Sequence, residues 1–292
     1  MHQFVNLTLI GITTGAVYAA VAMGLVLIWR ATRTVNFAQG AMATFSTYVA
    51  ATLIDRNVSY WLALVAAIVT GLIIGTLTER LLMRPIANTN QLNPVIIAIG
   101  MLIVLEAVSG MIWGAKYREF PSNFSVTGIK VGTSRIALSA FDIYVMVAVL
   151  VLMVALLVLF RWTSLGLKMR AAAFSPEIAR LLGVRVGRML TLGWALAVGM
   201  ASVAGVLAAP NVLLYPNNMD GVNVFAFTAA ILGGLDSPVG ALVGGLGMGF
   251  VVSYVGGYLG SSLETIGGLI VLLIVLSFRP QGIFAASAAR RV

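Results

Sequence analysis

The side chains that most enzymes use for covalent or metal chemistry are nearly absent from this sequence. Its 292 residues include no cysteine and a single histidine, His2, which stands near the terminus without partners. A thiol nucleophile and a cysteine-based zinc or iron–sulfur site are therefore excluded. An enzyme would need a cluster of nucleophile and base, or of metal ligands. We expect neither a catalytic residue nor a metal site.

Four polar residues in apolar stretches are candidates for lining a transport path: Asn36, Gln39, Glu106 and Asn223. A charge at the bilayer centre costs roughly 2.5–3.5 kcal/mol, so polar groups at that depth need a reason. Glu106 is the one acid well inside a predicted span; it either recognises a substrate ammonium group or lies near the outer interface. Asn36 either lines the path or caps a helix. The sequence around Asn36 is loosely echoed at residues 222–225, which would place two related elements beside a midplane cavity.

Residues 161–188 form a strongly basic loop that contains a short amphipathic helix signal. Ser175 begins the tripeptide Ser-Pro-Glu, which is typical of a helix start. Gly183 can adopt a positive φ and end the helix after two turns. The apolar stripe consists of Ile178, Leu181 and Leu182. A helix this short is not stable alone, so its apolar face rests either on lipid headgroups or in a partner protein.

Helices that cross a bilayer must position these residues. The chain is 60% hydrophobic and 9% charged, whereas soluble domains carry roughly a quarter charged residues. A helical span needs about 20 mostly apolar residues. The runs that meet or approach this length are 4–29, 36–54, 60–78, 94–114, 143–160, 189–210, 222–235, 239–259 and 265–278. We predict an all-α integral membrane protein, a single-domain polytopic helical bundle over residues 1–292. It has about eight or nine transmembrane segments, depending on whether the Gly-rich region 233–238 forms a re-entrant hairpin.

The distribution of cations predicts the orientation in the membrane. With the N-terminus outside, the external loops hold only Arg56, Lys116, Arg118, Lys130 and Arg135 of the 18 Lys and Arg. Cytoplasmic loops are enriched in these residues, so we predict an external N-terminus and a cytoplasmic C-terminus. The net charge of +9 then reflects cytoplasmic loops, and no nucleic acid partner is expected. Residues 115–141 become an external loop, either a connector or a small β-hairpin that touches an external partner.

Glycine pairs recur at four-residue spacing, which lets helix backbones approach closely in lipid. They serve packing either within this chain or against a second subunit. The pairs are Gly71 and Gly75, Gly240 and Gly244, Gly245 and Gly249, and Gly256 and Gly260.

The basic loop resembles the EAA loop of ABC importer permeases. Glu177-Ile-Ala-x-x-x-Gly183 is similar to Glu-Ala-Ala-x-x-x-Gly, with Ile178 in place of one alanine. The longer string 170–184 resembles the variant in permeases for branched-chain amino acids. Three further stretches agree with that subfamily: Thr34-Val-Asn-Phe-Ala-Gln-Gly40, Ala229-Ala-Ile-Leu-Gly-Gly-Leu-Asp-Ser-Pro-Val-Gly-Ala241 and Arg279-Pro-Gln-Gly-Ile-Phe284. In order and over nearly the whole chain, these landmarks are similar to the shorter of the two Liv-type permease subunits.

This resemblance implies a permease subunit of a binding-protein-dependent ABC importer in the bacterial plasma (inner) membrane. The implied substrates are leucine, isoleucine and valine; urea or short amides, which close relatives carry, are the nearest alternative. The implied partners are a second permease subunit, two ATP-binding subunits and an external substrate-binding protein. The loop residues implied to couple to the ATPase are Arg170, Ala172, Glu177, Ala179, Leu182 and Gly183.

The energy source must lie on another polypeptide. Each lysine is preceded by Ala, Ile or Leu, so the Gly-Lys pair of a phosphate-binding loop does not occur. We expect no cofactor on this chain and ATP-Mg on the partner subunits. An ion-coupled secondary transporter would need buried acids or a proton relay, which makes it a more distant alternative.

Overall fold

The computed structural model describes all residues except 1, 87–89, 91, 132–133, 280–281 and 285–292. The described part of the chain is almost entirely helical, and seven of its helices are long and apolar enough to cross a membrane. The elements are α1 (His2–Thr32), α2 (Gln39–Asp55), α3 (Tyr60–Leu77), η1 (Thr78–Met83), η2 (Arg84–Ile86), α4 (Asn93–Trp113), β1 (Lys130–Val131), β2 (Ser134–Arg135), α5 (Ala140–Trp162), α6 (Ser164–Phe174), α7 (Pro176–Leu181), α8 (Val186–Val212), α9 (Asp220–Gly233), α10 (Pro238–Tyr258), η3 (Ser261–Leu263) and α11 (Glu264–Phe278).

The predicted polytopic helical bundle is confirmed, but two of the predicted spans are short. Segments 36–54 and 222–235 form α2, of 17 residues, and α9, of 14. α2 begins later than predicted, at Gln39, because non-helical backbone and a turn occupy the residues before it, whereas α9 begins at Asp220, just before the predicted run. Adding α9 to the seven long helices gives eight spans, and adding α2 as well gives nine, the two expected totals. The Gly-rich region is a turn between α9 and α10, in which the Ser237 hydroxyl accepts from the Gly240 amide at 2.9 Å.

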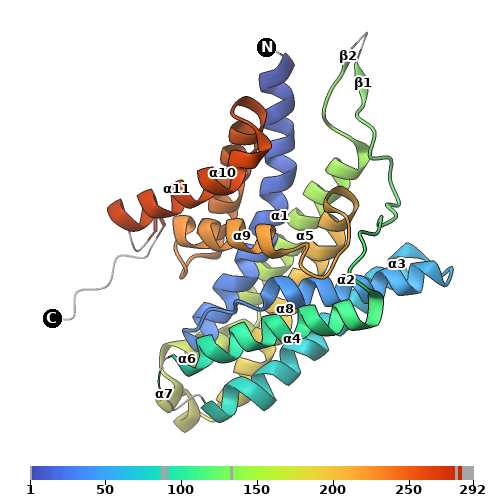
Figure 1. Cartoon of the computed structure of the whole chain (residues 1–292). Helices are drawn as coiled ribbons and strands as arrows, with labels where there is room; N and C mark the ends of the chain where they lie inside the picture. The colour runs from blue at the N-terminus through green and yellow to red at the C-terminus, as the bar shows by residue number, and fades with distance from the viewer. Residues whose placement is uncertain (1, 87–89, 91, 132–133, 280–281, 285–292) are drawn as a thin grey trace.

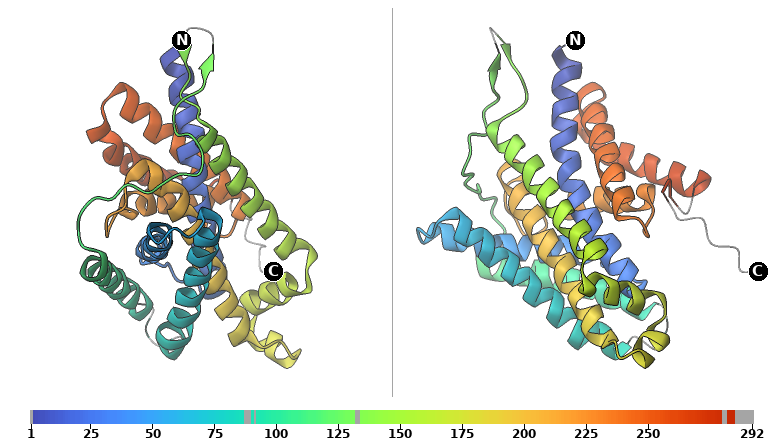
Figure 2. Two further views of the ribbon diagram at one scale, coloured as in Figure 1. Left: turned by 90° about the vertical axis from the view of Figure 1, so that its right-hand side faces the viewer. Right: turned by 180° about the vertical axis from the view of Figure 1, so that it is seen from behind.

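The centre of the bundle is formed by α1 and α8, which pack against each other. Of the most apolar 18-residue window of each helix, 78% is buried in α1 and 89% in α8. The corresponding value is 17% in α4 and α5 and 11% in α11, so these helices present most of their side chains outward. Figures 1 and 2 show α11 projecting from one side of the molecule, beside α10. The outer helices thus carry the surface suited to lipid.

Most of the glycine pairs pack helices within this chain. A Cβ on Gly245 of α10 would lie 2.5 Å from the Cα of Ala19 in α1, and one on Gly249 would overlap Gly15. Gly71 and Gly75 of α3 approach α8 in the same way. Small residues therefore set the spacing of the central helices. The fourth pair differs, because Gly260 lies in the turn after α10 with a φ of +115°.

The two long loops lie at opposite ends of the molecule. The loop before α5 contains an antiparallel hairpin that pairs Lys130 with Arg135, so the hairpin itself is present, while its contact with an external partner stays a prediction. This hairpin lies near the N-terminal end of α1, whereas α6 and α7 lie at the far end of α5 (Figure 1). The ion pair of Arg33 with Asp236, at 2.7 Å, joins the end of α1 to the α9–α10 turn.

Candidate substrate path and coupling surface

The N-terminal ends of α2 and α9 meet inside the chain, at a site that we call the polar junction. The Asn223 side-chain amide in α9 donates to the Phe37 carbonyl at 3.2 Å. A Cβ on Gly40 would lie 3.1 Å from the Cβ of Asn223, so glycine permits this close approach. One turn further along α2, the Thr44 hydroxyl donates to Asn218 Oδ1 at 2.8 Å. The two segments that echo each other in sequence are thus neighbours in space.

Asn36 holds the backbone that leads into α2. Its Oδ1 accepts from the Ala38 amide at 3.1 Å, and its Nδ2 lies 3.4 Å from the sulfur of Met42. The residue is 1% exposed. The N-cap of α2 is Ala38, which makes no side-chain capping bond, so Asn36 stabilises the turn before the helix and does not cap it.

Gln39 points away from the polar junction. Its Nε2 donates to the Val21 carbonyl of α1 at 2.9 Å, beside Gly24, and the residue is fully buried. Of the four candidate path residues, Gln39 is therefore the one that the fold places against α1.

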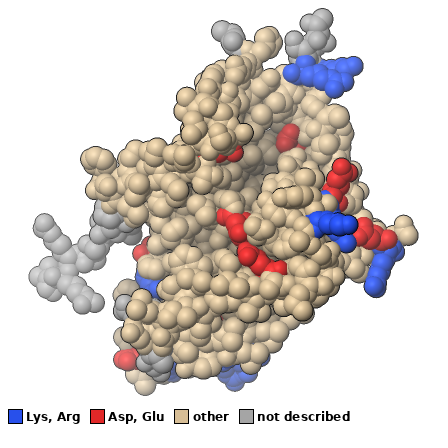
Figure 3. Space-filling view, in the orientation of Figure 1, with Lys and Arg blue, Asp and Glu red and all other residues tan. Residues whose placement is uncertain are grey.

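Glu106 faces an acid that the sequence did not single out. It lies in α4, and its carboxyl group interacts electrostatically with that of Asp220, the first residue of α9. Figure 3 shows acidic side chains along a hollow on a face that is otherwise mostly uncharged. Asp220 falls between the predicted spans 189–210 and 222–235, so the sequence alone predicts that it lies in a loop. The fold joins Glu106, Asp220 and Asn223 around the start of α9.

Several buried acceptors at this site have no hydrogen-bond partner within the described residues. They are Oε1 of Glu106, Oδ1 of Asn223 and, one turn beyond Glu106, the Ser109 hydroxyl. Buried polar atoms are nearly always paired, so unpaired acceptors indicate a place for a donor. An ammonium group offers three N–H donors and suits such a set of oxygens. No group of three or more potential metal-ligating His, Cys, Asp or Glu occurs among the described residues.

The predicted cytoplasmic helix is present as α7, which ends at Leu181. Gly183 follows with a φ of +80°, as the sequence predicts. Ser175 occupies the N-cap position, so the helix starts where the sequence predicts, although the Ser175 side chain makes no capping hydrogen bond. Arg170 in α6 instead ties this region to α5, donating to the Phe160 carbonyl at 2.6 Å.

The two alanines of the loop motif attach α7 to the rest of the chain. Ala172 of α6 and Ala179 of α7 pack with Val186 of α8 in a small apolar cluster, and each alanine is at most 2% exposed. Small side chains are needed where helices approach this closely. Large apolar side chains lie on the outside of the same element: Ile178 is 58% exposed, Leu181 87% and Leu182 76%. We call this outward set, together with the exposed Glu177, the coupling surface, after its candidate role.

A fully buried acid, Glu79, was also missed by the sequence analysis, which placed it just beyond a predicted span. Arg84 donates to both of its carboxylate oxygens, at 3.0 and 2.7 Å, and also to the Gly187 carbonyl at 2.8 Å. The Thr191 hydroxyl donates to the same carboxylate at 2.7 Å. This network fastens η1 to the start of α8, next to α7. Glu79 thus lies after the predicted run 60–78, near the end of the helical segment Tyr60–Ile86.

Comparisons with known proteins agree over nearly the entire chain. Residues 7–278 match the family model described as branched-chain amino acid transport system / permease component. The high-affinity branched-chain amino acid transport system permease protein LivH of Salmonella typhimurium is 30% identical, covering 97% of this chain and 96% of the relative. The corresponding protein BraD of Pseudomonas aeruginosa is 29% identical, covering 100% and 98%. A probable LivH of Methanocaldococcus jannaschii is also 29% identical, covering 90% and 86%.

A solved structure shares the fold. PsaBC from Streptococcus pneumoniae, in complex with a Fab, superposes with a TM-score of 0.52 over 96% of this chain and 93% of that chain, at 13% identity. The likeness concerns helix arrangement alone. Since the family model spans almost all of the sequence and the relatives are similar end to end, this chain belongs to the branched-chain amino acid transport system permease components.

Proposed function

We propose that this chain is the permease subunit that moves branched-chain amino acids through the inner membrane, in an importer driven by ATP hydrolysis on other subunits. Relatives that match along nearly their full length are named permease proteins of high-affinity branched-chain amino acid transport systems. A second permease, two ATP-binding subunits that hold ATP-Mg, and an external binding protein complete the assembly. This chain contributes the path and the coupling surface, and has no catalytic role.

In this proposal the polar junction contacts the polar end of the substrate. Glu106 and Asp220 attract the ammonium group, and the unpaired oxygen of Asn223 accepts one of its N–H donors. The surroundings are mainly apolar, since Leu105 of α4 packs with Ala38 and Met42 of α2. An aliphatic side chain suits such walls. Asn36 supports the junction by holding the backbone before α2.

The observation that carries the coupling half of the proposal is the exposure of α7. Its small residues are buried against α6 and α8, whereas Leu181 and Leu182 are directed outward. Exposed large apolar groups on a helix too short to be stable alone indicate a receiving surface. We assign that surface to an ATP-binding subunit, which would move α7 and through it α8.

The substrate half is tested with the complete complex in proteoliposomes. ATP-dependent uptake of leucine should exceed uptake of urea, and Glu106→Gln should lower leucine uptake tenfold or more, because a hydrogen bond to a charged group contributes about 1.5–3 kcal/mol. The control is Glu119→Gln, which changes an exposed carboxylate in the loop predicted to be external. It should leave leucine uptake unchanged. Urea uptake above that of leucine would favour the amide alternative, and leucine uptake without ATP would favour an ion-coupled transporter.

The coupling half is tested by truncating one exposed leucine. Leu181→Ser should reduce transport and transport-linked ATP hydrolysis at least fivefold, since a large side chain at an interface centre contributes about 1–2 kcal/mol or more. Leu167→Ser is the matched control, because Leu167 is 59% exposed in the neighbouring α6. Equal activity of both variants would refute docking through α7.

A further inference from the structure

A cavity of about 220 Å³ opens between α1, α5 and the start of α10, at the α6–α7 end of the molecule. Its inner part is apolar and includes Met23 of α1, Leu157 of α5 and Val239 of α10. Val239 is 50% exposed, and Val154 and Val158, which follow the lining residues Met153 and Leu157 in α5, are exposed too. The cavity therefore opens toward the side of the bundle that suits lipid.

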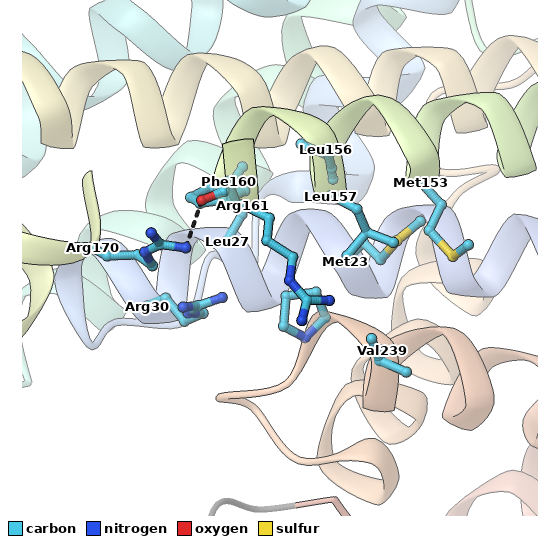
Figure 4. A pocket seen from close by; sticks show the side chains of 11 residues that line it. Met23, Leu27, Arg30, Met153, Leu156, Leu157, Phe160, Arg161, Arg170 and Val239 are labelled. Atoms are coloured by element: carbon cyan, nitrogen blue, oxygen red, sulfur yellow. Dashed lines mark hydrogen bonds between the residues drawn. The ribbon is translucent and has the colours of Figure 1, made fainter. Parts of the chain in front are cut away.

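Three arginines from three helices surround the other end of this cavity. Figure 4 shows Arg30 of α1, Arg161 of α5 and Arg170 of α6 gathered there, with the apolar side chains of α1, α5 and α10 beyond them. Along α5 the change from Met153 to Arg161 takes eight residues, or about 12 Å of helix. The cavity thus changes from apolar to cationic along its length.

In the part of the chain that the structure describes, none of the three arginines at the cationic end forms an ion pair, and Asp236 acts on Arg30 only at longer range. No described carboxylate lies within 4.0 Å of the Arg30, Arg161 or Arg170 side chains. Asp236, which lines the adjacent opening with Arg30 and Arg170, already accepts from Arg33 at 2.7 Å. Arg30 is half-buried and has its guanidinium 5.7 Å from the centre of the Phe160 ring.

We propose that this cavity binds an anionic phospholipid from the adjacent leaflet, with its phosphate on Arg161 and Arg30 and the upper part of an acyl chain along Leu157 and Val239. Basic pockets between transmembrane helices are suited to acidic headgroups, and a half-buried cation is stabilised by an opposite charge. A small free anion would satisfy the arginines but leave the apolar length of the cavity empty. Arg170 orients the site, since its guanidinium also holds the end of α5.

The test uses the full chain, purified in a zwitterionic detergent and titrated with phosphatidylglycerol, phosphatidylcholine or inorganic phosphate, with bound species counted by native mass spectrometry. Phosphatidylglycerol should bind selectively, and Arg161→Gln should weaken its binding about fivefold, with a similar further loss in the double variant with Arg30→Gln. Arg80→Gln is the matched control, because Arg80 is exposed and lies outside the cavity. A second variant, Leu157→Trp, fills the apolar part and should lower binding while keeping every charge.

Each alternative outcome overturns the site. Equal losses in Arg161→Gln and Arg80→Gln would mean a diffuse attraction between a basic protein and acidic lipid. Displacement of phosphatidylglycerol by an equal concentration of inorganic phosphate would mean a free-anion site. Unchanged phosphatidylglycerol binding by Leu157→Trp would show that the acyl chain does not occupy the cavity.

Discussion

At the scale of single residues, Glu79 carries a carboxylate into the bundle and has three donors there. Arg84 binds both oxygens in a fork, and Thr191 of α8 adds a hydroxyl. The carboxylate side chain is 2% exposed, whereas the arginine reaches 44%. Such a group is tolerated only while its partners remain, because an unpaired buried charge is costly.

Glu79→Gln should therefore lower the thermal midpoint of the purified chain. The substitution keeps the volume but replaces one acceptor by a donor that faces Arg84, for a loss of about 1–3 kcal/mol. Glu177→Gln, on the exposed face of α7, should not change the midpoint. Identical midpoints for both variants, measured by scanning fluorimetry, would contradict a stabilising role for the network.

Gly183 is the residue whose backbone conformation sets the end of α7. A φ of +80° costs L-residues other than Asn and Asp roughly 1–2 kcal/mol, and proline cannot adopt it. Gly183→Asn should keep most ATP-dependent uptake, whereas Gly183→Pro should abolish it while insertion into the membrane continues. A Cβ there meets nothing within 4 Å, so the cause is conformational and not steric. Equal uptake by the two variants would argue against this cause.

At the scale of elements, the contact of α1 with α10 depends on glycines on one face of α10. Gly245 and Gly249 meet α1, whereas Gly247 makes only an ordinary contact, 3.6 Å from a Cδ of Leu232. A substitution at Gly245 therefore tests the α1–α10 contact, and the same substitution at Gly247, on another face of α10, is its control.

Gly245→Ala should destabilise the chain by about 1–3 kcal/mol, because the added methyl group forces α1 and α10 apart. Gly247→Ala should be neutral or slightly stabilising, since alanine favours a helix by about 1 kcal/mol over glycine. Thermal midpoints in detergent measure both. A larger loss in Gly247→Ala would contradict the packing described here.

The sequence predicted most elements because runs without charge are long and clear. It also predicted the end of α7, since Gly183 has a defined backbone role. It did not predict that Asp220 faces Glu106 or that Glu79 is buried. Asp220 precedes the short apolar run 222–235. Glu79 follows the long apolar run 60–78 and directly precedes Arg80. Both lie at the ends of apolar runs, where depth in the bundle depends on how α2, α3 and α9 pack.

At the scale of the whole molecule, the loop before α5, which the distribution of cations predicts to be external, and α7 lie at opposite ends (Figure 1). The natural absence of cysteine allows a direct test of orientation. Asn123→Cys, in the exposed loop before α5, should react with a membrane-impermeant maleimide in intact cells. Arg180→Cys should react only after permeabilisation. The reverse pattern would invert the proposed topology.

The contrast between α8, 89% buried, and α11, 11% buried, has a consequence for how this chain can vary. The outward positions on α11 need only remain apolar, so leucine, isoleucine, valine and phenylalanine are interchangeable there, unlike at the buried Gly268. Positions on α1 and α8 are limited by volume, so even alanine to valine is disfavoured. A saturation mutagenesis survey should therefore divide the helices into two tolerance classes, and natural divergence should concentrate on the lipid-facing ring.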